Sequence, residues 1–179
     1  MGERDPGRLY SFPLITGVTD GILTALTFGA GRLFALHEPV NSNIMWRLAA
    51  AASLSAGFVF FVADYARLRF ELVNAERHLS LKSSSHLATT QLGRAIFYEA
   101  LRGMTISGAS GFFGSLFPLL VAVLWPRAPW LAMVASIAAL GLLGALLGGL
   151  LYGSMVRWAA ALMILGSALA AVGERLHIL

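Results

Sequence analysis

The stretch LITGVTDGILTALTFGAGRLFAL (residues 14–36) carries only two charged residues, Asp20 and Arg32, in an otherwise uncharged run. A transmembrane helix needs about 20 consecutive, mostly apolar residues, and this run is long enough. The whole chain shares this character, because 58% of its 179 residues are hydrophobic and 12% are charged. Soluble domains carry about 25% charged residues. The sequence therefore predicts an integral membrane protein.

Four further runs are long and apolar enough to cross a bilayer. The five predicted spans are 14–36, 44–66, 104–124, 131–152 and 155–173. Between the second and third spans lies the one sizeable polar segment, 67–103. Its first part is predicted to continue the second span as a helix, and KSSS (82–85) is expected to break it. Residues 86–103 are predicted to form a short amphipathic helix at the membrane surface, ended by Gly103. The predicted fold is all-α: a single polytopic membrane domain with five transmembrane helices and this amphipathic cytoplasmic segment.

The distribution of basic residues predicts the orientation of the chain in the membrane. With five spans, the side that holds the N-terminus carries nine lysine and arginine residues, and the other side carries four. Cytoplasmic loops are enriched in these residues. We therefore expect the N-terminus in the cytoplasm and the C-terminus outside, in a bacterial inner membrane or an organelle membrane.

Two carboxylates lie within or near the predicted spans. Asp20 is about six residues into the first span, or about 9 Å from its cytoplasmic end. Asp64 is near the cytoplasmic end of the second span, which runs in the opposite direction. The assignment therefore predicts similar depths for the two side chains, as ligands of one divalent metal ion. An aspartate inside a membrane helix costs about 2.5–3.5 kcal/mol to insert, so a functional role is expected.

Each carboxylate also has an alternative, purely structural interpretation. Asp20 could pair with an arginine of a neighbouring helix, and Asp64 could pair with Arg67 at the interface. Around Asp20, Gly17 and Gly21 form a small-xxx-small ridge that lets another helix approach closely. Gly144 and Gly148 predict a similar close contact in the fourth span.

Three further residues are weaker candidates for the metal path. Glu71 and Glu99 fit solvated helix faces best, and they could also collect cations at a cytoplasmic mouth. Met104 could offer a thioether near the mouth, or could serve only in packing.

The sequence argues against several other classes of function. It has no cysteine, which excludes disulfides and thiolate sites. It has no phosphate-binding glycine loop, no zinc-protease motif and no nucleophile elbow, so no enzyme is predicted. The basic segment lacks interleaved aromatic residues, so no nucleic-acid partner is expected. We expect no tightly bound cofactor.

Four segments resemble the vacuolar iron transporter family. TDGILTALTFGAG (19–31) resembles the first-span motif, and ADY (63–65) stands where that family usually has Gly-Glu-Tyr. FGSLFPLL (113–120) is similar to the third span. GLLYGSMVRWAAALMILGSALAAVGERL (149–176) is similar to the last span. The glutamate-rich cytoplasmic domain of the transporters is not evident in 67–103, so the chain is most similar to the family's nodulin-like branch.

The resemblance implies a homodimer with five helices per chain that exports Fe²⁺, and often Mn²⁺, from the cytoplasm in exchange for protons. It implies a path along the dimer interface. Asp20 matches the first-span acidic residue, and Asp64 matches the second-span glutamate. The partners expected are the lipid bilayer and a second copy of the chain. The alternative is an accessory subunit that keeps the fold without transport and packs against other membrane subunits.

Overall fold

The computed structural model describes residues 6–31, 41–78, 91–128, 130–150 and 153–175, and within these ranges all regular structure is helical. The described residues form five α-helices: α1 (Pro6–Gly31), α2 (Ser42–His78), α3 (Gln91–Leu124), α4 (Trp130–Leu150) and α5 (Met155–Arg175). Each contains a segment long and apolar enough to cross a membrane. The prediction of an all-α chain with five candidate spans is confirmed.

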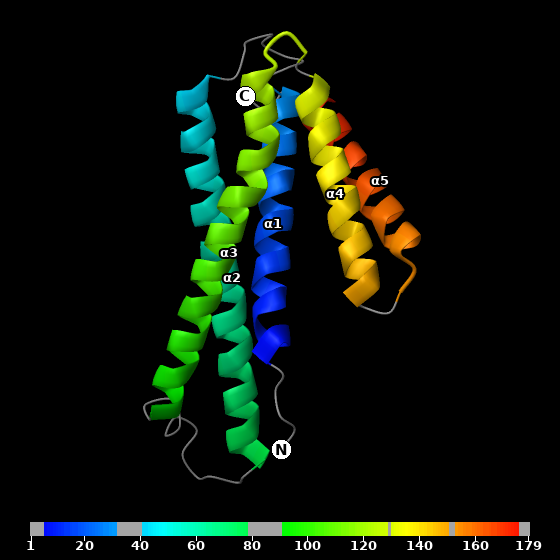
Figure 1. Cartoon of the computed structure of the whole chain (residues 1–179). Coiled ribbons are helices and arrows are strands. Elements are labelled where there is room, and N and C mark those ends of the chain that lie inside the picture. Colours follow the sequence, from blue (N-terminus) through cyan, green and yellow to red (C-terminus); the bar gives the residue numbers. More distant parts are fainter. Residues whose placement is uncertain (1–5, 32–40, 79–90, 129, 151–152, 176–179) are drawn as a thin grey trace.

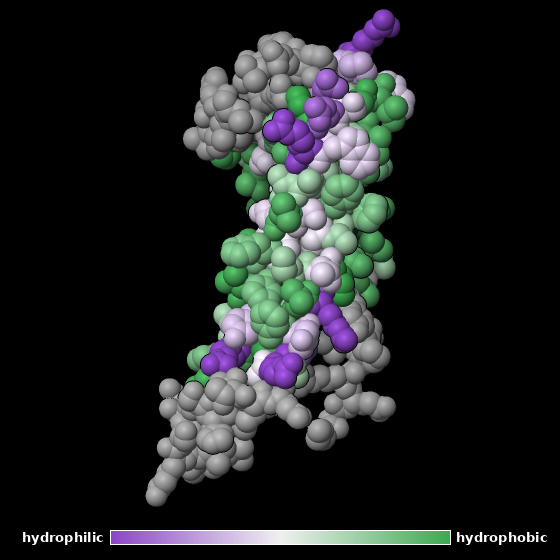
Figure 2. Space-filling model, turned by 90° about the vertical axis from the view of Figure 1, so that its left-hand side faces the viewer, coloured by the Kyte–Doolittle hydropathy of each residue, from purple (hydrophilic) through white to green (hydrophobic). Residues whose placement is uncertain are grey.

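The helices run alternately up and down, so that α1 begins and α5 ends at opposite ends of the bundle (Figure 1). A hydrophobic band crosses the middle of the molecule, with hydrophilic residues gathered toward both ends (Figure 2). Asp20 lies inside the span of α1, which covers Ser11–Phe28. This pattern fits a multi-pass protein embedded in a lipid bilayer.

The segment between the second and third spans differs from the prediction. Residues 67–78 continue α2, as expected, and residues 79–90, which include the predicted KSSS break, lie outside the described residues. The prediction of a separate surface helix at 86–103 is wrong for residues 91–103, the part that the structure describes. These residues form one continuous helix with the third span. Gly103 does not end this helix. It lies against the ring of Phe60 from α2, and this close approach favours glycine at that position.

This continuity gives the bundle a two-helix extension. At 1.5 Å per residue, α2 (37 residues) and α3 (34 residues) are about 55 and 51 Å long, whereas the 21 residues of α4 span about 32 Å. The hydrocarbon core of a bilayer is about 30 Å thick. In Figure 1, α2 and α3 project together past α1 at the end where α1 begins. The ring of Phe97 packs edge-on against Phe61 and Tyr65 and so joins the two helices.

Small residues hold α1 against α3. A methyl group at Gly17 would meet the backbone of Ser107, and one at Gly21 would meet the backbone of Gly111. The ridge predicted around Asp20 therefore packs against α3. Because two of the turns that flank Asp20 are fixed in this way, the side chain of Asp20 has a defined direction.

α4 and α5 form a hairpin that packs on the other side of α1. Gly144 and Gly148 lie against the backbone of α5 at Trp158 and Met155, as the sequence predicted for a close contact. The turn between the two helices is closed by a hydrogen bond of 2.9 Å from Gly153 N to Gly148 O. A buried cluster joins the hairpin to α1 and consists of Ile22, Leu26, Leu140 and Ala170.

Candidate functional site

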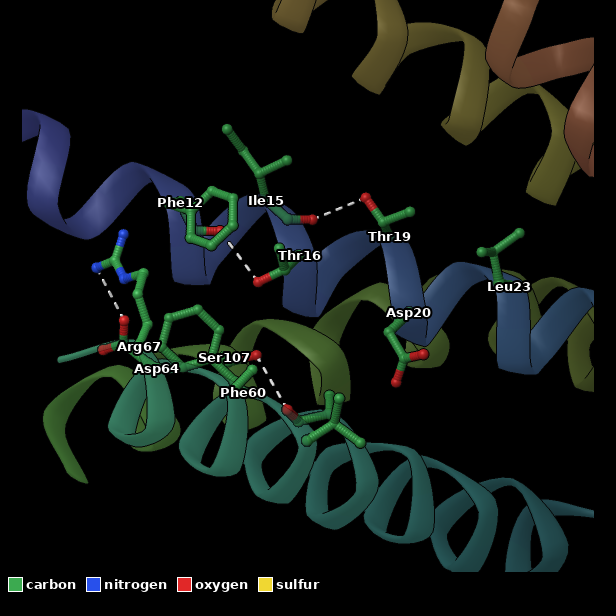
Figure 3. A pocket seen from close by; sticks show the side chains of 13 residues that line it. Phe12, Ile15, Thr16, Thr19, Asp20, Leu23, Phe60, Asp64, Arg67 and Ser107 are labelled. Atoms are coloured by element: carbon green, nitrogen blue, oxygen red, sulfur yellow. Dashed lines mark hydrogen bonds and ion pairs between the residues drawn. The ribbon is translucent and has the colours of Figure 1, made fainter. Parts of the chain in front are cut away.

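A pocket of about 560 Å³ lies between α1 and α2, with α3 behind it (Figure 3). It exists because α1 and α2 each pack closely along α3 but touch one another over a much shorter length. Its walls are mostly apolar, and it is open on one side. The lining residues are Phe12, Ile15, Thr16, Thr19, Asp20, Leu23, Ala56, Val59, Phe60, Ala63, Asp64, Arg67 and Ser107.

Asp20 is the charged residue contributed by α1. It is half-buried, and its carboxylate points from α1 toward α2 (Figure 3). Within the described part of the chain, no side chain forms an ion pair or hydrogen bond with it. The predicted alternative, an arginine from a neighbouring helix, is therefore not met among the described residues. A carboxylate in a mostly apolar pocket is left available for a cation or a proton.

Three hydroxyl groups line the pocket with Asp20. Thr16 Oγ1 donates to the carbonyl oxygen of Phe12 and Thr19 Oγ1 to that of Ile15, at 3.0 and 2.8 Å. Ser107 Oγ donates to the carbonyl oxygen of Ala56 across the α2–α3 contact, at 3.3 Å. Each hydroxyl uses its hydrogen in these bonds, so its oxygen presents lone pairs that can accept from, or coordinate, a cation.

Asp64 is in a different environment. Its Oδ1 lies 3.0 Å from a guanidinium nitrogen of Arg67, one helical turn further along α2. The Asp64 side chain is 13% exposed and that of Arg67 is 62% exposed. This is the ion pair that the sequence offered as the structural alternative. Both residues line the pocket, so Arg67 already supplies a positive charge beside Asp64.

The two carboxylates lie at different levels of the pocket. The rings of Phe12 and Phe60 are 6.0 Å apart and fix the relative height of α1 and α2. Asp20 follows Phe12 by eight residues, and Asp64 follows Phe60 by four in the opposite direction. These offsets correspond to about 18 Å along the helix axes.

A second set of contacts gives a smaller offset, but the conclusion is the same. Gly21 of α1 lies against Gly111 of α3, which lies beside Ala56 of α2, so Gly21 and Ala56 stand at about the same height. Counted along each helix from this level, Asp20 and Asp64 are offset by about 10 Å. Oxygen ligands bind divalent metals at about 2.0–2.6 Å. Both offsets place the two carboxylates at different levels of the pocket, whereas the sequence predicted similar depths; that they share one ion stays a prediction. The sequence did not specify how far the two helices are offset.

The weaker candidates do not line this pocket. Glu71 is exposed, Glu99 is half-buried on α3, and Met104 packs against Gly57 at the α2–α3 contact. In the described ranges, no three His, Cys, Asp or Glu side chains come together as a metal site. A metal bound at Asp20 would need ligands beyond the acidic and histidine side chains of one described chain.

Sequence reasoning missed the aromatic lining. Phe12 and Phe60 line the pocket between the levels of the two carboxylates. The signal was present on α1, because Phe12, Thr16 and Asp20 recur every four residues and so share one face of a helix. Phe60, Asp64 and Arg67, spaced four and three residues apart, likewise share one face of α2.

Comparison with known proteins adds no identification, since no protein family, curated protein or solved structure matches this chain.

Proposed function

We propose that this protein exports a divalent transition metal, Fe²⁺ or Mn²⁺, from the cytoplasm in exchange for protons, with Asp20 as the central carboxylate. One observation carries the proposal: Asp20 is a carboxylate in a candidate membrane span that lines a pocket, without a partner among the described residues. Ionisable residues inside membrane spans are costly and commonly mark ion pathways. The resemblance of four segments to the iron transporters supports the same function.

The path in this proposal has two ion-binding positions, which we call stations: the first at Asp64 and the deep one at Asp20. Asp64, with Arg67, lies toward the end of the pocket from which α2 and α3 project, and the positive-inside pattern assigns that end to the cytoplasm. Asp20 lies deeper. An ion first meets Asp64, where it competes with Arg67, and then passes to Asp20 and the hydroxyl oxygens of Thr16 and Thr19.

The proposal requires a second copy of the chain. One chain offers a single free carboxylate at the deep station, and transition metals in oxygen sites take several ligands. A two-fold axis beside the open pocket would bring together two Asp20 side chains. Proton exchange then follows from charge, because each carboxylate is neutralised either by the metal or by a proton.

The test is metal flux into proteoliposomes. Purified native protein is reconstituted under an imposed proton gradient, and uptake of Mn²⁺ and of Fe²⁺ is followed with an internal fluorescent reporter. We expect saturable uptake by the native protein, none by Asp20→Asn, and partial uptake by Asp20→Glu, which keeps the charge. Elution of each variant as a single peak of native size controls for folding.

Two outcomes would overturn the proposal. Absence of flux from well-folded native protein would favour the accessory-subunit alternative, and co-purification with other membrane subunits would be the next measurement. Flux that persists in Asp20→Asn would remove Asp20 from the path.

A further inference from the structure

We infer that the same pocket binds a monovalent organic cation with an apolar body, whose positive centre pairs with Asp20. This inference needs the pocket of only one chain and does not depend on metal transport. It follows from three features of the pocket: its size, its lining and the position of its one unpaired charge.

The size and lining suit an organic molecule. Pockets for small molecules usually measure about 300–1,000 Å³ and are mostly apolar with a few polar groups, and this one measures about 560 Å³. Ile15, Leu23, Ala56, Val59 and Ala63 contribute apolar surface. A hydrated metal ion makes no use of such walls, whereas the apolar body of an organic cation is removed from water against them.

The charges within the pocket favour a ligand with a positive charge and indicate which end of the pocket that charge occupies. Asp64 is neutralised by Arg67 at 3.0 Å, so the uncompensated charge among the lining residues is that of Asp20. An anion would meet this carboxylate unfavourably, and a neutral molecule would leave it unpaired. The positive centre therefore sits at the deep end.

The aromatic residues lie along the way to that end. The rings of Phe12 from α1 and Phe60 from α2 pack against each other and line the pocket, with centroids 6.0 Å apart and planes tilted by 53°. Aromatic faces attract cations, most strongly where water is excluded. A delocalised cation with aromatic substituents would thus find apolar contact at Phe12 and Phe60 and its counter-ion at Asp20.

Tetraphenylphosphonium is a suitable probe because it combines one delocalised positive charge with an apolar body. Binding of the radiolabelled ion to full-length protein in lipid nanodiscs is measured by equilibrium dialysis, with empty nanodiscs to correct for partition into lipid. We expect saturable binding to native protein, retention in Asp20→Glu, and affinity at least tenfold weaker in Asp20→Asn. Glu71→Gln removes the same charge from an exposed position outside the pocket and should bind as native.

A second variant tests the pocket itself. Ala63 lines the pocket and is exposed, so Ala63→Leu narrows the pocket without entering a packed core. We expect it to weaken tetraphenylphosphonium binding several-fold. Its thermal midpoint should match that of the native protein, so that weaker binding can be attributed to the narrower pocket and not to loss of folding.

The results separate this inference from the metal proposal. Equal binding by native protein and Asp20→Asn, or an equal loss in Glu71→Gln, would overturn it, because binding would then reflect partition or general charge. Unchanged binding in Ala63→Leu would also contradict it. Saturable, Asp20-dependent binding without metal flux would support the organic cation and reject the metal. Metal flux without tetraphenylphosphonium binding would support the metal proposal and reject the organic cation.

Discussion

The two carboxylates of the pocket differ in what surrounds them, and the difference separates a structural acid from a functional one. Asp64 has Arg67 at 3.0 Å on its own helix, whereas Asp20 has no ion-pair partner among the described residues. Both aspartates fall within candidate spans, Asp20 at the middle of Ser11–Phe28 and Asp64 in the last third of Ser42–Asn74, toward the end of α2 that forms the projecting extension. An acid paired with an exposed arginine costs the fold little. An unpaired acid within a membrane span costs more free energy, and such residues commonly have a function.

The largest predicted effect concerns the packing that directs Asp20. Gly21 lies against the backbone of Gly111, so Gly21→Val should push α1 away from α3 and prevent recovery of folded protein, or lower the thermal midpoint by more than about 10 °C. Thermal unfolding followed by tryptophan fluorescence measures this.

The matched control is Gly149→Val, at an exposed position where the nearest atom is the flexible end of Met155. It should change the midpoint by no more than about 2 °C. Similar midpoints for the two variants would show that α1 is not held against α3 as described.

The next effect concerns the competition at Asp64. Removing the guanidinium in Arg67→Gln frees the Asp64 carboxylate and takes a positive charge from the pocket. The Mn²⁺ concentration that gives half-maximal flux should fall several-fold, and the maximal rate should change less.

Arg69→Gln removes the same charge from a residue that does not line the pocket. It should shift the half-maximal concentration by less than about twofold, as expected for a screened surface charge. An equal shift in both variants would mean that net charge, and not the Asp64–Arg67 pair, controls entry.

The smallest effect tests how little the ion pair contributes to stability. Because Arg67 is 62% exposed, the pair should contribute at most about 1 kcal/mol. Asp64→Asn should therefore unfold within about 3 °C of the native protein in the same fluorescence assay. A much larger destabilisation would make Asp64 a structural anchor of the α2 extension and would weaken its assignment as a station on the path.

Much of the fold followed from local pattern. Run length predicted five helices, and the spacing of Gly17 and Gly21 predicted a close helix contact, because both signals lie within one element. The Asp64–Arg67 pair was also predictable, since residues three apart on a helix are neighbours.

The longer-range features were not predictable in the same way. Residues 91–103 continue α3, and Gly103 within this stretch contacts Phe60, which is 43 positions away in the chain. The different levels of Asp20 and Asp64 depend on how far α1 is offset against α2. Tertiary contacts set that offset, and no short stretch of sequence encodes it.

The most direct test of the central claim compares Asp20→Asn with Asp64→Asn in one set of proteoliposomes, at equal protein and equal proton gradient. The account predicts that Mn²⁺ flux falls to the level of empty vesicles in Asp20→Asn and stays measurable, at roughly a tenth of native or more, in Asp64→Asn, because the free carboxylate holds the ion and the paired one only admits it. Equal loss of flux in both variants, or a greater loss in Asp64→Asn, would contradict the claim that the unpaired aspartate is the functional one.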